Sequence, residues 1–178
     1  MKILSVDQAR NGAWSIFDFE KKKLLRYGIF EYRSYKYTFA QAVLNIERLI
    51  NSLIQEHQID VVFIEGIQLR CNVKSYCALA QLQGVLINLF EKNQYPYFVV
   101  PPVAWQNYCK AKKEKNRQAI EAAQGKKNSK MLSINFVKEK FDISTTNDNL
   151  ADAICIGWYV CNNYQMQGDV LSVKTGKN

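Results

Sequence analysis

Two short apolar strands in this sequence each end on an acidic residue, and this feature limits the folds open to the chain more than any other. The first strand runs through residues 3–6 into Asp7, and the second runs through residues 61–64 into Glu65. Neighbouring carboxylates at the ends of buried strands disfavour their own ionisation, and a divalent cation offsets that cost. Oxygen ligands of this kind suit Mg²⁺ or Mn²⁺. With a third acid, Asp152, at the start of a C-terminal helix, the pattern indicates metal-dependent phosphodiester chemistry.

Hydrophobic periodicity and turn signals predict an alternation of strands and helices. Three strands are expected first, at residues 2–7, 13–18 and 24–32, and short polar turns at residues 11–12 and 20–23 make them antiparallel neighbours. A capping box at Thr38 opens a helix that continues to about residue 54. The later elements are expected to be a buried strand at 59–65, a helix at 75–91, a strand at 97–100, and helices at 103–109, 129–140 and about 147–164.

This order of elements predicts a single α/β domain over residues 1–164, with a basic insertion at about 110–130 and a polar C-terminal tail at 165–178. A helix before a buried strand is typical of a crossover to a parallel position. In a five-stranded mixed sheet of order 3-2-1-4-5 with flanking helices, strands 1 and 4 are then parallel neighbours. Their carboxyl ends meet at one edge, where open α/β sheets carry their sites, so Asp7 is expected beside Glu65. The last helix has only to cross that edge to bring Asp152 to them.

The positive charge of the chain is concentrated in one segment. The 178 residues carry a formal net charge of +8, and the window 110–130 accounts for +6, with eight Lys or Arg residues against two acids. A local basic segment favours contact with a polyanion, nucleic acid first, over a uniformly solvated surface. The basic residues of this window are Lys110, Lys112, Lys113, Lys115, Arg117, Lys126, Lys127 and Lys130.

Several other classes of protein fit the sequence poorly. The five cysteines show no Cys-x-x-Cys spacing and the chain has one histidine, which argues against a Cys/His zinc site and against a Ser/His/Asp hydrolase. The thiols are expected to be reduced, in the cytoplasm. Eight glycines without a Gly-rich phosphate loop fit an actin-like ATPase or a sugar kinase poorly. No apolar stretch approaches the length of a membrane span, and no signal peptide is expected.

The ordered set of motifs resembles RuvC-type Holliday junction resolvases, within the ribonuclease H-like superfamily of nucleases. The matching pieces extend from residue 2 to about 160 and are Ile-Leu-Ser-Val-Asp7, Val-Val-Phe-Ile-Glu65, Leu-Ala-Gln-Leu-Gln-Gly-Val and Asp148-Asn-Leu-Ala-Asp152-Ala-Ile. Each piece is short, and the specificity lies in their order and spacing. The length and the basic insertion look closer to phage or viral members than to cellular ones. The resemblance implies a ribonuclease H-like fold and an endodeoxyribonuclease that cleaves Holliday junctions and other branched DNA, in a bacterial or phage-infected cytoplasm.

The resemblance also implies a metal site. Asp7, Glu65 and Asp152 would hold two Mg²⁺ ions, which Mn²⁺ can replace, with Asp7 as the bridging ligand. The family usually has a fourth acidic or His ligand three positions before the last Asp, where this chain has Asn149. Asp148 stands four positions before that Asp, and residues i and i+4 share a helix face, so Asp148 is a candidate ligand. A plain helix-capping role for Asp148 stays equally open.

DNA contacts follow from the same resemblance. Lys130 lies just before the penultimate helix, where the family often has a functional lysine, and it is expected to hold the scissile phosphate or to stabilise developing charge. Some relatives carry an aromatic residue after the central Glu that stacks at the junction centre, and here Leu69 and Tyr76 are the alternatives for that role. Arg70 and Lys74 are further expected contacts. A four-way junction has two-fold symmetry, and the family implies a homodimer.

Two neighbouring functions remain as alternatives. An RNA-processing nuclease of the same fold would use the same acids, and the sequence does not separate DNA from RNA. A non-catalytic module that binds branched DNA would keep the fold, although it would gain nothing from three acids beside phosphates. Mg²⁺-dependent cleavage separates such a binding module from a nuclease.

Overall fold

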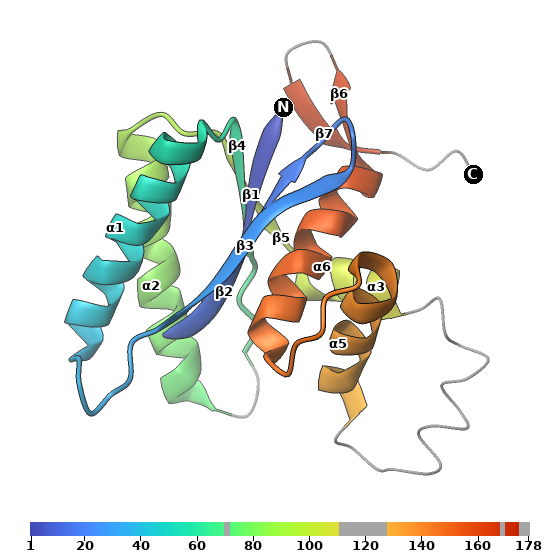
Figure 1. Cartoon of the computed structure of the whole chain (residues 1–178). Helices are drawn as coiled ribbons and strands as arrows, with labels where there is room; N and C mark the ends of the chain where they lie inside the picture. Colours follow the sequence, from blue (N-terminus) through green and yellow to red (C-terminus); the bar gives the residue numbers. More distant parts are fainter. Residues whose placement is uncertain (70–71, 111–127, 168–169, 175–178) are drawn as a thin grey trace.

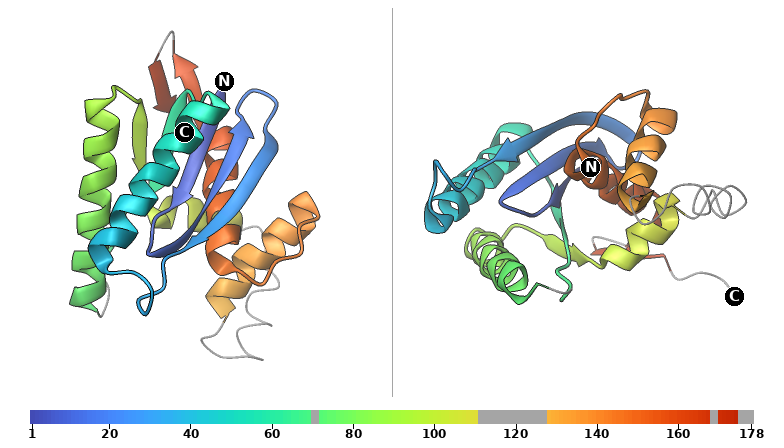
Figure 2. Two further views of the ribbon diagram at one scale, coloured as in Figure 1. Left: turned by 60° about the vertical axis from the view of Figure 1, so that its left-hand side comes forward. Right: turned by 90° about the horizontal axis from the view of Figure 1, so that it is seen from below.

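The computed structural model describes residues 1–69, 72–110, 128–167 and 170–174. In this part of the chain a five-stranded mixed sheet lies between two layers of helices (Figure 1 and Figure 2). The strands follow the order β3-β2-β1-β4-β5 that the sequence predicts, and they are β1 (Lys2–Asp7), β2 (Asn11–Asp18), β3 (Lys23–Glu31), β4 (Val61–Glu65) and β5 (Tyr97–Val100). Strands β1, β2 and β3 pair antiparallel, whereas β4 pairs parallel with both β1 and β5.

Helices cover both faces of the sheet. One face carries α1 (Phe39–His57) and α2 (Val73–Lys92), and the other carries α6 (Asp148–Asn163), with α3 (Pro102–Lys110) and α5 (Asn128–Phe141) packed against α6 (Figure 1). Helix α1 begins where the sequence predicts, because Thr38 and Gln41 form the capping box: the Thr38 hydroxyl accepts a hydrogen bond from the Gln41 N–H at 3.2 Å. None of the described helices has both the length and the apolar character needed to cross a membrane.

Alternation along the two central strands decides which way the acids point. Odd-numbered residues of β1 and β4 face α6, and even-numbered ones face α1 and α2. The hydrophobic cluster on the α6 side includes Ile3, Val61 and Phe63, whereas the cluster on the other side includes Leu4, Val6, Val62 and Ile64. The period of two carries on to Asp7 and Glu65, which therefore project toward the α6 layer. Val6 pairs with Ile64, so the two acids come next to each other at the carboxyl ends of these strands.

Helix α6 is fixed to the sheet by a buried pair of serines. The hydroxyl oxygens of Ser5 and Ser15 are 2.6 Å apart, and each lies 2.9 Å from the Ala153 carbonyl oxygen. Each hydroxyl has one proton. One serine therefore donates to the Ala153 carbonyl, and the other serine donates to the hydroxyl oxygen of the first. Gly157 allows the same close approach further along the helix, since a Cβ there would lie 2.6 Å from the ring of Phe17. These contacts fix the distance between α6 and β1, and with it the position of Asp152, the residue before Ala153.

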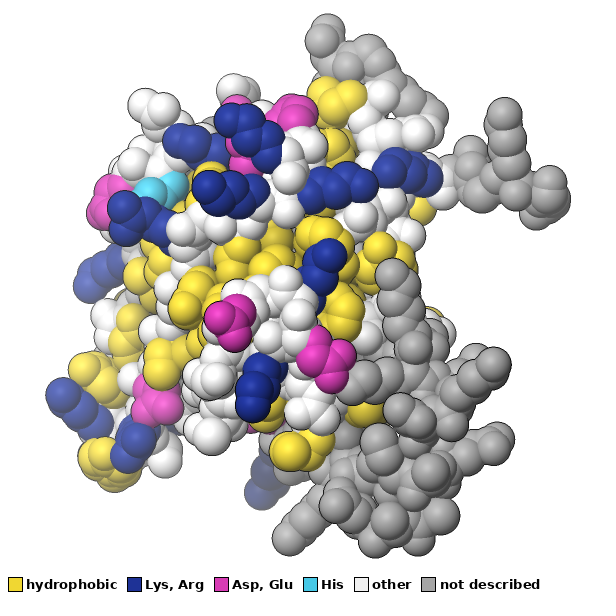
Figure 3. All heavy atoms as spheres, turned by 45° about the vertical axis from the view of Figure 1, so that its right-hand side comes forward, with side chains coloured by type: hydrophobic (Ala, Val, Ile, Leu, Met, Phe, Trp, Pro, Cys, Tyr) yellow, Lys and Arg dark blue, Asp and Glu magenta, His cyan; other side chains and the backbone are white. Residues whose placement is uncertain are grey.

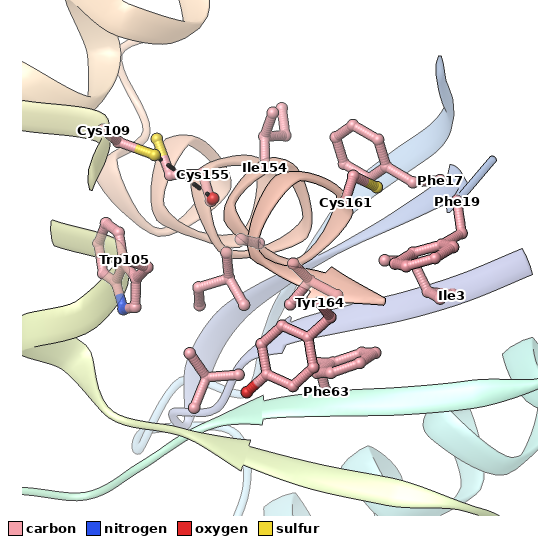
Figure 4. Close-up of a cluster of buried hydrophobic side chains, with 14 of the residues drawn as sticks. Ile3, Phe17, Phe19, Phe63, Trp105, Cys109, Ile154, Cys155, Cys161 and Tyr164 are labelled. Atoms are coloured by element: carbon pink, nitrogen blue, oxygen red, sulfur yellow. Dashed lines mark hydrogen bonds between the residues drawn. The ribbon is translucent and has the colours of Figure 1, made fainter. Parts of the chain in front are cut away.

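The core on the α6 side is rich in aromatic rings (Figure 4). Tyr164 packs edge-on against Phe63, with 5.2 Å between the ring centroids, and Phe63 stacks on Phe98 at 5.3 Å. Trp105 lies in the same cluster beside Cys109 and is fully buried. The other two tryptophans are partly buried and pack against the two clusters.

The turn that the sequence predicts at residues 11–12 is wrong. Asn11 and Gly12 begin β2 instead, where they pair with Glu31 and Phe30 of β3. A Cβ at Gly12 would lie 2.6 Å from the Phe30 ring, so this glycine permits close packing within the sheet. The chain reverses one step earlier, at residues 8–10.

The segment expected as a polar tail also differs from the prediction. Residues after α6 form an antiparallel pair of strands, β6 (Tyr164–Gln167) and β7 (Val170–Val173). Leu171 is buried in the α6-side core, and Lys174 donates through its backbone N–H to the Asn163 carbonyl at 2.7 Å. Backbone pairing and the burial of Leu171 thus give regular structure to the described residues of a segment whose composition is mostly polar.

Candidate functional site

Four acidic side chains from three elements meet at the carboxyl edge of the sheet. Asp7 ends β1, Glu65 ends β4, and Asp148 and Asp152 lie about one turn apart at the start of α6. Asp7 is 8% exposed, and burial raises its pKa well above the usual value; the negative charges of Glu65 and Asp152 raise it further. A side-chain hydrogen bond with Glu65 and the charge of Asp148 act in the same direction. The fold therefore brings together the four acids that the sequence singles out.

The start of α6 separates the two roles that the sequence leaves open for Asp148. The N-cap is Asn147, whose side-chain oxygen accepts a hydrogen bond from the Leu150 N–H at 2.9 Å. Asp148 lies in the first turn, where its charge acts on Asp7. Asn149 donates through Nδ2 to the Asn11 carbonyl at 2.8 Å and so ties the first turn of α6 to β2. The cap is thus Asn147 and not Asp148, and Asn149 makes a structural contact.

Two side chains that sequence reasoning did not connect with the site contact Glu65 directly. The indole N–H of Trp105 donates to Glu65 Oε1 at 3.0 Å. Gln8 donates through Nε2 to the main-chain carbonyl of Glu65 at 2.6 Å, which joins the end of β1 to the end of β4. The sequence offers one hint of the contact from Trp105. A tryptophan in an apolar pattern has an indole N–H that needs a hydrogen-bond partner once it is buried, whereas a phenylalanine has no such group.

The chemistry of the acids suits a divalent cation, although their present positions do not enclose one. Among the described His, Cys, Asp and Glu side chains, no group of three or more could hold a metal ion as it stands. Carboxylates without a cation between them repel one another, and the raised pKa of Asp7 reflects that repulsion together with its burial. The donor set consists of carboxylate oxygens, which hard cations such as Mg²⁺ and Mn²⁺ prefer. The four acids fit such a cation, and binding requires them to draw together.

A cavity of about 300 Å³ opens beside the acids. Asp7, Gln8 and Glu65 line one side of it, and Tyr76 of α2 lines another. Leu69, the other residue expected at the junction centre, is 63% exposed. Lys74 is exposed on the first turn of α2. The structure thus brings Tyr76 to the acids, whereas Leu69 projects into solvent.

Most of the expected DNA contacts lie outside the described residues. These contacts are Arg70, Lys112, Lys113, Lys115, Arg117, Lys126 and Lys127. Lys110 and Lys130 belong to α3 and α5 by their backbone, and their side chains are outside the described part of the structure. On the face seen in Figure 3, the described Lys and Arg side chains are dispersed, with acidic side chains among them.

The acidic cluster should make the stability of the metal-free protein depend on pH. Because the pKa of Asp7 is raised in the folded protein, the fold binds its proton more tightly than the unfolded chain does, and stability is lost as the pH rises above the usual aspartate value of 3.8. The Asp7→Asn variant is expected to melt at a higher temperature than wild type in EDTA at pH 7. The gain should shrink as the pH falls toward 4. Thermal unfolding of both proteins between pH 4 and 8 measures this difference.

Asp142→Asn is the matched control, since Asp142 is exposed at the end of α5 and asparagine tolerates its positive φ of 57°. This variant is expected to follow the wild-type curve at every pH. Parallel curves for wild type and Asp7→Asn would contradict the raised pKa. Addition of Mg²⁺ should raise the melting temperature of wild type but not that of Asp7→Asn, because only a folded state that binds the ion is stabilised by it.

Comparison with known proteins gives a family and a fold. The family description "Crossover junction endodeoxyribonuclease RuvC" matches residues 18–157. The Thermus thermophilus RuvC structure in complex with a Holliday junction substrate is similar, with a TM-score of 0.66 and 12% identity over 90% of this chain and 92% of that one. The structure of fowlpox virus resolvase with its Holliday junction DNA is similar with a TM-score of 0.56 and 18% identity, over 91% of this chain and 97% of that one. The yeast mitochondrial Holliday junction resolvase Ydc2 has a TM-score of 0.57 and 13% identity, over 89% of this chain and 77% of that one. These likenesses establish the ribonuclease H-like fold, whereas no curated protein matches the chain.

Proposed function

Because this chain belongs to the RuvC family of crossover junction endodeoxyribonucleases, we propose that it is a structure-selective endonuclease that cuts Holliday junctions and other branched DNA. The observation that carries the proposal is the burial of Asp7 among Glu65, Asp152 and Asp148 at the carboxyl edge of the sheet. Acids gathered at such an edge repel a phosphodiester unless a cation accompanies them. A pure DNA-binding module would gain nothing from this cluster.

Each acid has a proposed task in the reaction. Asp7, Glu65, Asp152 and Asp148 would hold two Mg²⁺ ions, which Mn²⁺ can replace, through carboxylate oxygens. Such ions would supply an activated water for attack on phosphorus and would stabilise the leaving 3′ oxygen. Because the pKa of Asp7 is raised by burial and by its acidic neighbours, a proton competes with the metal for this carboxylate, and metal binding is expected to strengthen as the pH rises.

Lys130 is proposed to hold the scissile phosphate or to stabilise charge that develops on it. The support is the start of α5 at Asn128, which lies at the same lower edge of the molecule in Figure 1 as the start of α6. A positive charge at this edge would oppose the acids and attract the backbone of DNA. Tyr76, which lines the cavity beside Asp7, is proposed to contact an unpaired or unstacked base at the branch point.

The active unit is proposed to be a homodimer. A four-way junction has two-fold symmetry, and paired nicks on opposite strands require two sites related by the same symmetry.

The basic segment is proposed to contact DNA phosphates. Replacing Lys112, Lys113 and Lys115 together by Gln should weaken junction binding and flatten its dependence on salt, by about 0.9 units of log–log slope for each phosphate that the protein no longer neutralises. Binding isotherms between 50 and 200 mM salt, measured with Ca²⁺ or EDTA to prevent cleavage, give the slope.

A matched triple replacement is Lys21, Lys22 and Lys23 to Gln, which covers the end of the turn between β2 and β3 and the first residue of β3. This turn adjoins Asp18, which pairs with Lys2 at the amino end of β1, so it lies at the sheet edge opposite the acids. The control removes the same charge and is expected to leave the slope close to that of wild type. Equal slopes for wild type and the Lys112, Lys113 and Lys115 variant would show that the segment does not contact DNA.

One panel of substrates tests the proposed function against its two alternatives. Labelled four-way junction, linear duplex, single strand and RNA are incubated with wild type in Mg²⁺, Mn²⁺ or EDTA. The proposal expects metal-dependent nicks in the junction and in other branched DNA. Tight junction binding without cleavage in either metal would favour the binding module, and cleavage of RNA instead of DNA would favour an RNA-processing nuclease.

A further inference from the structure

Trp105 combines full burial with a polar contact to the acidic cluster. Its side chain has 0% exposure and lies in the α6-side core beside Cys109 (Figure 4). An indole N–H removed from water needs an acceptor, because a buried donor left without one destabilises the fold. Trp105 Nε1 donates to Glu65 Oε1 at 3.0 Å, so the acceptor is a carboxylate of the proposed site. Such a bond to a charged acceptor is stronger than one between neutral groups.

The short connection between β5 and α3 fixes the position of the Trp105 indole N–H. Glu65 pairs with Val100 of β5, and the Gly66 N–H donates to the Val100 carbonyl at 2.8 Å. Helix α3 begins at Pro102, only two residues after β5 ends, and the Ala104 N–H donates to the Pro101 carbonyl at 3.0 Å. This abrupt passage from strand to helix brings Trp105 back to the end of β4, where its ring is held by the core.

Glu65 has a reason to need a fixed donor. Its side chain has three rotatable bonds and is partly exposed. It shares a side-chain hydrogen bond with Asp7, and when neither carboxyl group holds a proton the two negative charges repel each other. Without a fixed donor, a carboxylate in this position can turn toward solvent, away from its neighbours. A donor held rigidly by packing opposes that movement, because the indole has few torsions of its own and is surrounded by buried side chains.

We propose that Trp105 is a positioning residue for Glu65: its indole N–H holds one carboxylate oxygen and keeps this side chain at the acidic edge, ready for a divalent cation. The inference rests on the proposed function, since a cation is what the carboxylate is positioned for. Partners that orient metal ligands are typically worth 10–100-fold in metal affinity or activity. Trp105 is therefore part of the core and part of the site at once.

The test replaces the indole N–H of Trp105 and keeps the shape of its fused ring. Benzothienylalanine is incorporated at position 105 in the full chain, because it keeps the two fused rings and has sulfur in place of the N–H. The same replacement at Trp158 is the matched control. Trp158 lies in the second half of α6, away from the acids at its start, and its ring packs against Phe141 with 5.5 Å between the ring centroids. Mn²⁺ binding is measured from the spin-resonance signal of the free ion, and thermal unfolding in EDTA is measured on the same samples.

The expected result is that Mn²⁺ binds about 10-fold more weakly when position 105 lacks the N–H, and that the Mg²⁺ concentration for half-maximal junction cleavage rises by a similar factor. The Trp158 control should bind Mn²⁺ as wild type does. Trp105→Phe should behave like the analogue at position 105, with an added loss of stability from the smaller ring. Junction binding in EDTA should be unchanged in all of these proteins.

Two failures can be told apart. Wild-type Mn²⁺ affinity in the protein with the analogue at position 105 would overturn the positioning role, whereas cleavage by wild type would still support the proposed function. Equal losses of Mn²⁺ affinity at positions 105 and 158 would also overturn it, because they would point to a general effect on the core. A wild-type protein that neither binds Mn²⁺ nor cuts a junction would overturn the proposed function, and the role of Trp105 with it.

Discussion

The Asp7→Asn variant is expected to lose cleavage of a four-way junction almost completely while it binds the junction as tightly as wild type, or more tightly. The carboxylate of Asp7 is proposed to be a metal ligand at the centre of the acidic cluster, and asparagine removes its negative charge. Partners of metal ligands are already worth about 10–100-fold, so loss of a ligand at the centre of the cluster should lower the rate constant by more than about 100-fold. Binding should not suffer, because the same change removes a negative charge from a site that receives phosphates. Single-turnover cleavage and gel-shift titration measure the two quantities separately.

Asp142→Asn serves here as well, since it exchanges an exposed aspartate for asparagine. It should cut and bind as wild type does. Full activity of Asp7→Asn would show that the acids at the sheet edge are not the site of reaction. Loss of both cleavage and binding, with a melting temperature no lower than that of wild type, would instead assign Asp7 to DNA binding.

Gly157→Ala is expected to destabilise the protein markedly and to reduce cleavage. A Cβ at this position would lie 2.6 Å from the ring of Phe17 and 2.7 Å from the Ser5 hydroxyl oxygen, and both side chains are buried. Overpacking of this kind typically costs about 1–3 kcal/mol, and each kcal/mol corresponds to about 2–4 °C in melting temperature for a chain of this size. The strain acts where Ser5 and Ser15 hold α6, so Asp152 should also lose its position above β1.

Gly84→Ala is the control for this change, because it is the same exchange on another helix. Gly84 is exposed on α2, and no atom lies within 4 Å of a Cβ built there. Alanine should raise the stability by about 0.5–1 kcal/mol through its helix propensity. Thermal melts of both variants give the comparison. A Gly157→Ala protein as stable as Gly84→Ala would contradict the close approach between α6 and the sheet.

The sheet order could be predicted because its signals are local and strong. Short turns make β1, β2 and β3 neighbours, and the helices before β4 and β5 permit only crossovers to parallel positions. Asp7 and Glu65 end their strands, so the parallel pairing of β1 with β4 brings them together. The turn at residues 11–12 failed for the opposite reason: Asn-Gly is a strong turn signal, but pairing with β3 and the approach of Phe30 outweigh it.

Interactions between distant residues explain what the sequence could not predict. Trp105 reads as a core residue on a short helix, and nothing near it in the sequence points to Glu65, forty positions earlier. Ser5 and Ser15 interrupt apolar strands without a visible partner, because their acceptor, the Ala153 carbonyl, comes from the last helix. Leu171 likewise gives little warning of β7 within a polar segment. In each case the partner is set by the packing of whole elements.

The acids at the carboxyl edge of the sheet are proposed to form a divalent-metal centre, so the position of a bound ion is the quantity to measure. Anomalous scattering from crystals of the wild-type protein grown with Mn²⁺ would give the position of the ion. We expect anomalous density bounded by Asp7, Glu65 and Asp152, with the carboxylates drawn closer together than they are without metal. Density at other residues only, or none at saturating Mn²⁺, would contradict it.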